Sequence, residues 1–170
     1  LEAYPLPTMD QSEIEPNVFE DWAVNDDGTE YTLTIRKGLK WSDGVPVTTE
    51  DVRFAIEDVF KNKKISPVFP GWLKRDGKPV ELEVIDDYTF KLKFATSYGI
   101  FPLRLNSHAY GDPSALIIPK HYMKQYHINY TSLEDMGDEL EEEGLNDEWW
   151  QLFNTRNSGS GTATLTKESV

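Results

Sequence analysis

The chain has 170 residues, of which 17 are Lys or Arg and 30 are Asp or Glu, so its formal net charge is −13. This balance opposes binding to nucleic acid and docking to anionic lipid, because both require clustered Lys and Arg. The sequence contains no cysteine, which excludes disulfides, thiolate nucleophiles and cysteine metal sites. Its length suits one domain with a real core, and its 5 Trp and 12% aromatic content argue against disorder.

The first strong turn pattern is the Asn-Asp-Asp-Gly run at 25–28. It predicts a β-hairpin, because Asp-Gly supplies positions that accept φ > 0. After it, residues 31–35 alternate between apolar and polar, which is the period of a half-buried strand. Before it, residues 13–21 are expected to form a short helical turn, and Trp22 is interpreted as a core anchor rather than a ligand-stacking platform.

A capped helix is predicted next. Gly38 and the Ser-Asp-Gly run at 42–44 indicate tight turns that lead towards it. Thr48 and Asp51 have the spacing of a helix N-cap and its N3 partner. Apolar residues then recur at helical spacing over 52–60.

A second hairpin is predicted over 80–94. Apolar residues alternate with glutamates on its first strand and with threonine and lysines on its second, and Asp86-Asp87 forms the turn. If the strands pair antiparallel, Glu faces Lys across the strands, and each contact contributes a few tenths to ~1 kcal/mol. One apolar and one charged face would therefore fix the register.

Two connecting stretches are less regular. Residues 66–78 are rich in Pro and Gly but carry large apolar side chains, which we expect to turn back into the core rather than line a binding rim. Residues 101–105 fit either a short helix or a buried strand, and the pattern leaves both open.

The C-terminal third is predicted to be helical. One helix is expected to begin at Pro119, a second after a capping box of Thr131 and Glu134, and a third at Asn146 as its N-cap. Residues 134–148 are strongly acidic and contain no Lys or Arg. We interpret them as a solvated helical face rather than a site for cations or a basic partner.

These elements predict an α+β fold, with a mostly antiparallel sheet of hairpins, a central amphipathic helix and a helical C-terminal third. Residues 1–156 are expected to form a single domain. Residues 157–170 are rich in Ser, Gly and Thr and predict a flexible tail or linker.

No motif for catalysis, a cofactor or a metal emerges from the sequence. His108, His121 and His127 form no i, i+4 pair, which would place two imidazoles on one helical face. The glycines at 159 and 161 lack the preceding strand and the third glycine of a dinucleotide motif. We therefore expect a non-enzymatic protein without cofactor or metal, and we assign no ligand-binding residue.

The main alternative is a carbohydrate-binding module or a cell-surface interaction domain, which exposed aromatic and acidic side chains would suit. Such a module needs several aromatic rings aligned on one flat sheet face. Here the clearest strands place their aromatic residues on predicted core faces, which counts against it.

Several runs of the sequence, in order, carry a family resemblance: DDG, YTLTIRKG, KWSDG, PVT and EDV, with IIPKHY at 117–122. In this order and spacing they resemble the extracellular solute-binding proteins of family 5, the peptide and nickel type. These proteins are the capture subunits of ABC importers. The resemblance covers about residues 13–153.

The resemblance implies a parent protein with two lobes that close around a solute, and a fragment centred on the domain inserted in the first lobe. The implied partners are the remaining lobes, a peptide or other small solute, and an ABC permease, with no nucleic acid. The implied location is extracytoplasmic, in the periplasm or at the cell surface, where a lipid anchor could tether the parent.

Five positions match the family signature: Gly38, Trp41, Asp43, Gly44 and Pro46. We expect structural roles for them, with turns at the glycines and a core anchor at Trp41. In the family the solute is held mainly between the two large lobes, so the resemblance implies a scaffold, or at most one wall of the cavity, for this segment.

Overall fold

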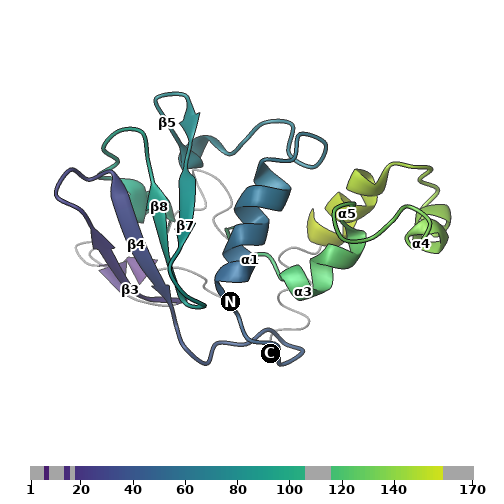
Figure 1. Ribbon diagram of the computed structural model, residues 1–170, viewed down its shortest axis with the longest axis horizontal. Coiled ribbons are helices and arrows are strands. Elements are labelled where there is room, and N and C mark those ends of the chain that lie inside the picture. Colours follow the sequence, from purple (N-terminus) through teal and green to yellow (C-terminus); the bar gives the residue numbers. More distant parts are fainter. Residues whose placement is uncertain (1–5, 8–13, 16–17, 106–115, 159–170) are drawn as a thin grey trace.

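The computed structural model describes residues 6–7, 14–15, 18–105 and 116–158. The fold is α+β, as predicted, and its main sheet is antiparallel with the strand order β3-β4-β8-β7 (Figure 1). Two further pairs, β1 with β2 and β5 with β6, are short. The strands are β1 Leu6–Pro7, β2 Ile14–Glu15, β3 Phe19–Val24, β4 Glu30–Ile35, β5 Lys74–Arg75, β6 Lys78–Pro79, β7 Glu81–Val84 and β8 Thr89–Lys93.

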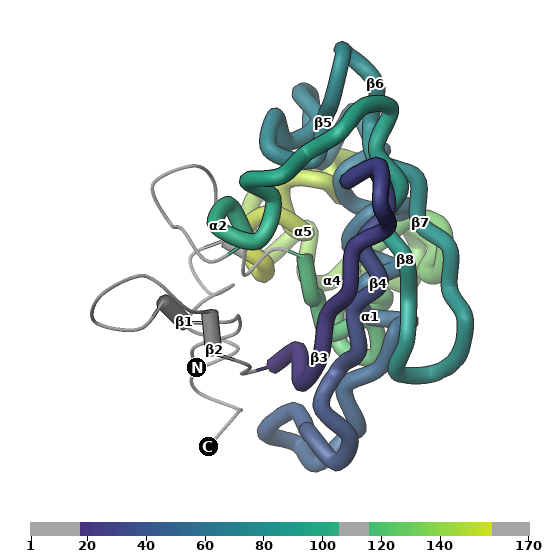
Figure 2. The backbone as a smooth tube through the Cα atoms, turned by 90° about the vertical axis from the view of Figure 1, so that its left-hand side faces the viewer, coloured from purple at the N-terminus to yellow at the C-terminus, as the bar shows by residue number. Residues whose placement is uncertain are grey.

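One continuous helix, formed by α1 and the π-helical η1, lies between the sheet and the C-terminal helices (Figure 1). The view in Figure 2, turned by 90°, shows the four strands of the sheet side by side. The helices are α1 Thr49–Arg53, η1 Phe54–Phe60, α2 Phe101–Leu105, α3 Lys120–Met123, α4 Gly137–Glu142 and α5 Trp149–Ser158, with the 3₁₀ turns η2 Gly71–Leu73 and η5 Lys124–Tyr126.

The first predicted hairpin is confirmed as β3–β4, with Val24 opposite Tyr31. Its turn is closed by the Asn25 backbone, whose N–H donates to Glu30 O at 3.0 Å. The helical turn predicted for 13–21 is wrong where the structure describes it, because Phe19 and Asp21 belong to β3 and pair with β4. Cross-strand pairing here outweighs the local pattern.

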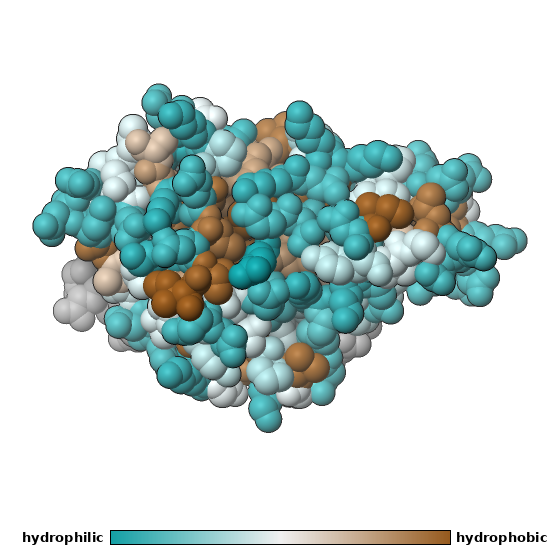
Figure 3. All heavy atoms as spheres, viewed as in Figure 1, coloured by the Kyte–Doolittle hydropathy of each residue, from teal (hydrophilic) through white to brown (hydrophobic). Residues whose placement is uncertain are grey.

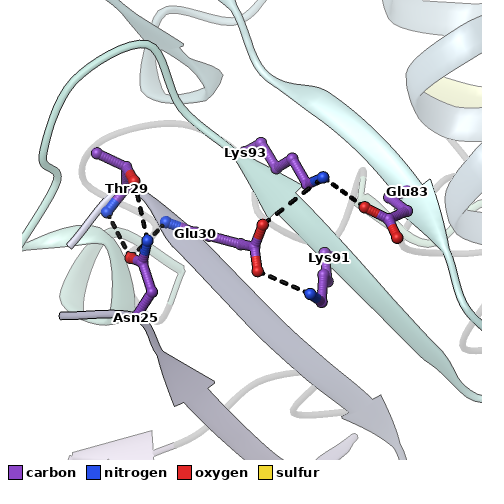
Figure 4. A network of polar contacts seen from close by, with 6 residues as sticks. All are labelled: Asn25, Thr29, Glu30, Glu83, Lys91 and Lys93. Carbon is purple, nitrogen blue, oxygen red and sulfur yellow. Dashed lines mark hydrogen bonds and ion pairs between the residues drawn. The ribbon is translucent and has the colours of Figure 1, made fainter. Parts of the chain in front are cut away.

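The second predicted hairpin is confirmed as β7–β8, and its glutamates lie opposite lysines. Lys93 Nζ lies 2.5 Å from a carboxylate oxygen of Glu83. Glu30, from the first hairpin, lies 2.8 Å from Lys91 and 3.6 Å from Lys93 (Figure 4). This charged network therefore joins the two hairpins across the outer face of the sheet, a connection that the sequence does not indicate.

The core lies between the sheet and the α1–η1 helix. The apolar side chains of the helix are buried in one cluster with those of β4 and β8. In the loop at 66–78, Trp72 and Leu73 turn into this core as predicted, whereas Val68 stays 78% exposed. Trp22 is half-buried and stacks on Tyr31, with their ring centroids 6.4 Å apart.

Two of the predicted helix starts are wrong. Ser132, not Thr131, accepts the backbone N–H of Asp135, at 3.1 Å, while the Thr131 hydroxyl donates to Lys124 O. The last helix begins at Trp149, beyond the Asn146 predicted as its cap. The Ser132 bond closes a turn ahead of the helix, and α4 itself begins at Gly137, with Met136 as its N-cap and no side-chain cap.

The turn at Gly28 gives a sharp test of the hairpin geometry. Gly28 has φ +66°, and a Cβ added there would lie 2.7 Å from Ser97 Oγ. We expect Gly28→Ala to lower the free energy of unfolding by about 2 kcal/mol, because left-handed backbone costs an L-residue roughly 1–2 kcal/mol and the clash adds to it. Urea unfolding would measure this loss.

The control is Gly38→Ala, at φ +84° with no atom within 4 Å of the added Cβ. The loss of stability in this variant therefore comes from backbone strain alone, without a steric clash. The two glycine variants should differ in their free energy of unfolding by the cost of the Ser97 contact. The double variant Gly28→Ala with Ser97→Ala should recover that part of the loss. Equal losses in both, with no recovery in the double variant, would show that Ser97 does not restrict this turn.

Candidate functional site around Asp51

Asp51 lies in the first turn of α1, and its side chain closes the predicted cap. Thr48 and Asp51 form the reciprocal capping box, in which Asp51 Oδ2 accepts the Thr48 backbone N–H at 3.1 Å. Asp51 is only 4% exposed. The sequence predicts this local pair but none of the more distant partners of the same carboxylate.

The KWSDG run folds into a small hairpin in front of the helix. Trp41 N–H donates to Val45 O at 2.8 Å, and Gly44 N–H donates to Trp41 O at 2.9 Å. Gly44 adopts φ +86°, the left-handed conformation found at the last position of three-residue hairpin loops. The Trp41 indole Nε1–H then donates to Asp51 Oδ2 at 3.1 Å. The hairpin is therefore fastened to the start of α1 through Trp41.

The remaining signature residues lie around this hairpin. Gly38, at φ +84°, turns the chain after β4. Pro46 is exposed and forms an isolated antiparallel bridge with Lys40. Trp41 is half-buried and packs against the margin of the core. All five signature positions thus fall on one short segment beside α1.

The IIPKHY run reaches the same point from far along the chain. The Lys120 backbone N–H donates to Asp51 Oδ1 at 3.0 Å, and Lys120 Nζ lies 2.7 Å from a Glu50 carboxylate oxygen. His121 Nε2 lies 2.6 Å from Asp43 Oδ2. Asp51 therefore joins the hairpin, the helix cap and the start of α3.

The electrostatics fit a structural role for this carboxylate. Burial raises the pKa of Asp51, while the N–H donors from Lys120, Thr48 and Trp41 act in the opposite direction. Its oxygens already accept three hydrogen bonds, so the carboxylate is engaged rather than poised as a base. Asp43, held by the Val45 N–H and then by His121, has a lowered pKa.

A groove of about 210 Å³ opens beside this junction. It is lined by Val45, Pro46, Thr48, Glu50, Asp51, Lys120, His121 and Lys124. Two of its basic side chains are already paired, Lys120 with Glu50 and His121 with Asp43. The groove can accept a polar group at its rim, but it brings together no nucleophile and base.

Metal ligands do not cluster in the part of the chain that the structure describes. Within it, no group of three or more His, Asp or Glu side chains has the arrangement of a metal site. None of the helices in these described ranges is long and apolar enough to cross a membrane. His108 lies outside the described residues.

Comparison with known proteins identifies the family. A model of the bacterial extracellular solute-binding proteins, family 5 (middle), matches residues 13–159. The chain belongs to this family.

Individual proteins that are similar to this family 5 chain are named as binding proteins for particular solutes. It is 33% identical over 131 residues to a periplasmic alpha-galactoside-binding protein of Rhizobium meliloti, covering 74% of this chain and 18% of that protein. It is 39% identical over 67 residues to the dipeptide-binding protein DppE of Bacillus subtilis, covering 39% of this chain and 12% of DppE. The chain therefore spans less than a fifth of these relatives.

Solved structures agree with the fold. An oligopeptide-binding protein OppA superposes with a TM-score of 0.73 at 36% identity, covering 86% of this chain and 22% of that one. MelB of Agrobacterium fabrum, solved with stachyose, gives a TM-score of 0.58 at 29% identity, covering 76% of this chain and 20% of MelB. Of the runs that carried the family resemblance in the sequence, KWSDG, PVT, EDV and IIPKHY meet at Asp51.

Proposed function

We propose that this family 5 chain is part of the substrate-binding subunit of an ABC importer for peptides or similar solutes, acting outside the cytoplasm in the periplasm or at the cell surface. Its partners would be the remaining lobes of the parent protein, the solute and the permease. The family match over residues 13–159 carries this proposal. Relatives named for dipeptides, oligopeptides and alpha-galactosides support a role in solute capture.

Within that subunit we assign the chain a non-catalytic role, as a scaffold or one wall of the solute cavity. Residues 1–156 would form the single domain inserted in the first lobe. The groove beside Asp51, at about 210 Å³, is smaller than the roughly 300–1,000 Å³ of typical ligand pockets. Its central carboxylate is also occupied by three protein N–H groups. This favours a rigid support over a complete binding site.

The outer face of the sheet argues against an independent carbohydrate-binding module. Glu30 lies opposite Lys93, Thr32 opposite Lys91, and Thr34 opposite Thr89 on this face. Charged and hydroxyl side chains therefore stand where such a module would need aromatic rings. On the face drawn in Figure 3, hydrophobic side chains gather only in small groups among hydrophilic ones.

Thermal unfolding of the chain with two separate ligand pools tests the scaffold role. One pool contains short peptides and the other oligosaccharides such as stachyose. A ligand at ~100 times its Kd stabilises by about 2.7 kcal/mol, which would raise the melting midpoint of a chain of this size by roughly 5–10 °C. We expect a cooperative transition that neither pool moves. The OppA relative, melted with the same peptide pool, is the positive control.

Each alternative outcome has a defined meaning. A shift with oligosaccharides alone would support the carbohydrate-binding module in place of the scaffold. A shift with peptides would show that this segment itself holds much of the solute cavity.

A further inference from the structure

His127 lies at the boundary between η1 and the C-terminal helices, and its side chain is 0% exposed. We call residues 120–158, which comprise α3, η5, α4 and α5, the helical unit. The imidazole is enclosed by rings from both sides of this boundary. The ring-centroid distances are 5.8 Å to Phe54 of η1, 5.8 Å to Tyr130, 5.0 Å to Trp149 and 5.7 Å to Phe153 of α5.

The two ring nitrogens have opposite partners. Nε2 lies 3.1 Å from the backbone carbonyl oxygen of Asp58, and a carbonyl can only accept. Nδ1 lies 3.1 Å from the backbone N of Asn129, and an N–H can only donate. The partners therefore select the neutral imidazole with its proton on Nε2.

A second proton would have to enter on Nδ1. It would point at the Asn129 N–H, so two donors would face each other and the amide would lose its acceptor. The resulting charge would also sit inside a buried aromatic enclosure, where an ion is costly unless it is paired. Protonation thus opposes the contacts that hold this boundary closed.

Charged groups around the imidazole do not remove this conflict. Asp58 of η1 favours the protonated imidazole. Its carboxylate, however, already accepts hydrogen bonds from Asn129 Nδ2 at 3.0 Å and from the Tyr130 hydroxyl at 2.9 Å. Further out, Lys120 of α3 lies above the Tyr130 ring and is paired with Glu50 of α1. The residues of α5 that contact the imidazole, Trp149 and Phe153, are uncharged.

The tyrosine beside the imidazole also stays neutral through the acid and neutral range. Burial, followed by its bond to Asp58, raises the pKa of Tyr130 to about 12. Burial lowers the pKa of His127 itself, against the opposing effect of Asp58. The net balance therefore favours an uncharged imidazole in the folded chain.

We propose that protonation of His127 acts as an acid-triggered release, which loosens the helical unit from η1 while the sheet stays folded. Above about pH 6.5, imidazole is neutral in both the closed and the released chain, so the contact is intact. As the pH falls below this value, the released form binds a proton that the closed form excludes, and release becomes more favourable. The proposal goes beyond the importer role and does not depend on it.

Hydrogen exchange of backbone amides, followed between about pH 7.5 and 5.5 and corrected for intrinsic rates, tests this release. One proton taken up per release changes its equilibrium by up to about tenfold per pH unit. We expect amides of the helical unit to lose protection by this factor below pH 6.5, while amides of β4 and β8 keep theirs. The variant His127→Gln, which cannot titrate, should show no such change.

His121→Gln is the matched control, because His121 pairs with Asp43 at the surface and should leave the exchange profile unchanged. The proposal would be overturned if His121→Gln abolished the loss of protection below pH 6.5, or if His127→Gln retained it. If His127→Gln does not fold, NMR titration of the His127 ring in the unaltered chain decides. Protonation of that ring while the helical unit keeps full protection would equally contradict it.

Discussion

Replacing Asp51 by alanine is expected to lower the free energy of unfolding by about 2–4 kcal/mol. The change removes the acceptor of three N–H groups, from Trp41, Thr48 and Lys120. A buried donor left without a partner costs about 1–3 kcal/mol, although the adjoining groove lets water reach part of this site. Relief of the buried charge, whose pKa burial raises, offsets some of the loss.

Asp51→Asn separates geometry from charge. The amide has almost the same shape but only one accepting oxygen. It can keep the two donors that share Oδ2, while its NH₂ group then faces the Lys120 N–H. We therefore expect about half the loss of the alanine variant, measured by urea unfolding.

Asp43 supplies the control for both Asp51 variants. It lies on the neighbouring hairpin with its side chain 42% exposed, and exposed ion pairs contribute about 0–1 kcal/mol. Asp43→Ala should therefore cost less than about 1 kcal/mol. If Asp43→Ala destabilises the chain as much as Asp51→Ala, Asp51 is not the residue that holds the hairpin, the helix cap and the start of α3 together.

This site shows what the sequence can and cannot predict. The Thr48–Asp51 cap and the turns at Gly28 and Gly44 follow from short-range patterns, because their partners lie within a few residues. The bond from Asp51 to Lys120 joins residues far apart in the chain, and no local spacing indicates it. The family resemblance includes both KWSDG and IIPKHY, but it does not predict that they meet at Asp51.

His127 illustrates the same limit. A single histidine in a helical third is usually structural or solvated, and the sequence gives no reason to choose. Its aromatic neighbours come from η1 and α5, so the enclosure exists only after the helices have packed. Likewise, Glu30 joins the network with Lys91 and Lys93 because β4 lies next to β8, which the two separate hairpin patterns do not specify.

Phe101 should produce the other large effect. The sequence leaves residues 101–105 open between helix and strand, and the structure makes them α2. Phe101 is fully buried. Its ring centroid lies 4.8 Å from that of Tyr31 and 5.0 Å from that of Phe94, and it stacks on Trp72. It therefore joins β4, the end of the second hairpin and the loop at 66–78 in one aromatic cluster.

We expect Phe101→Ala to cost about 3–5 kcal/mol, because a buried aromatic ring leaves a cavity that its neighbours fill only in part. The melting midpoint should fall by roughly 6–20 °C. Leu103, on the same helix but 52% exposed, is the matched control, and Leu103→Ala should cost under about 1 kcal/mol. Equal losses would show that burial of the Phe101 ring is not what holds α2 in place, because both variants introduce Ala, the best helix former. A large difference would show that this short helix is held in place by the ring it buries, since five residues are too few to be stable as a helix alone.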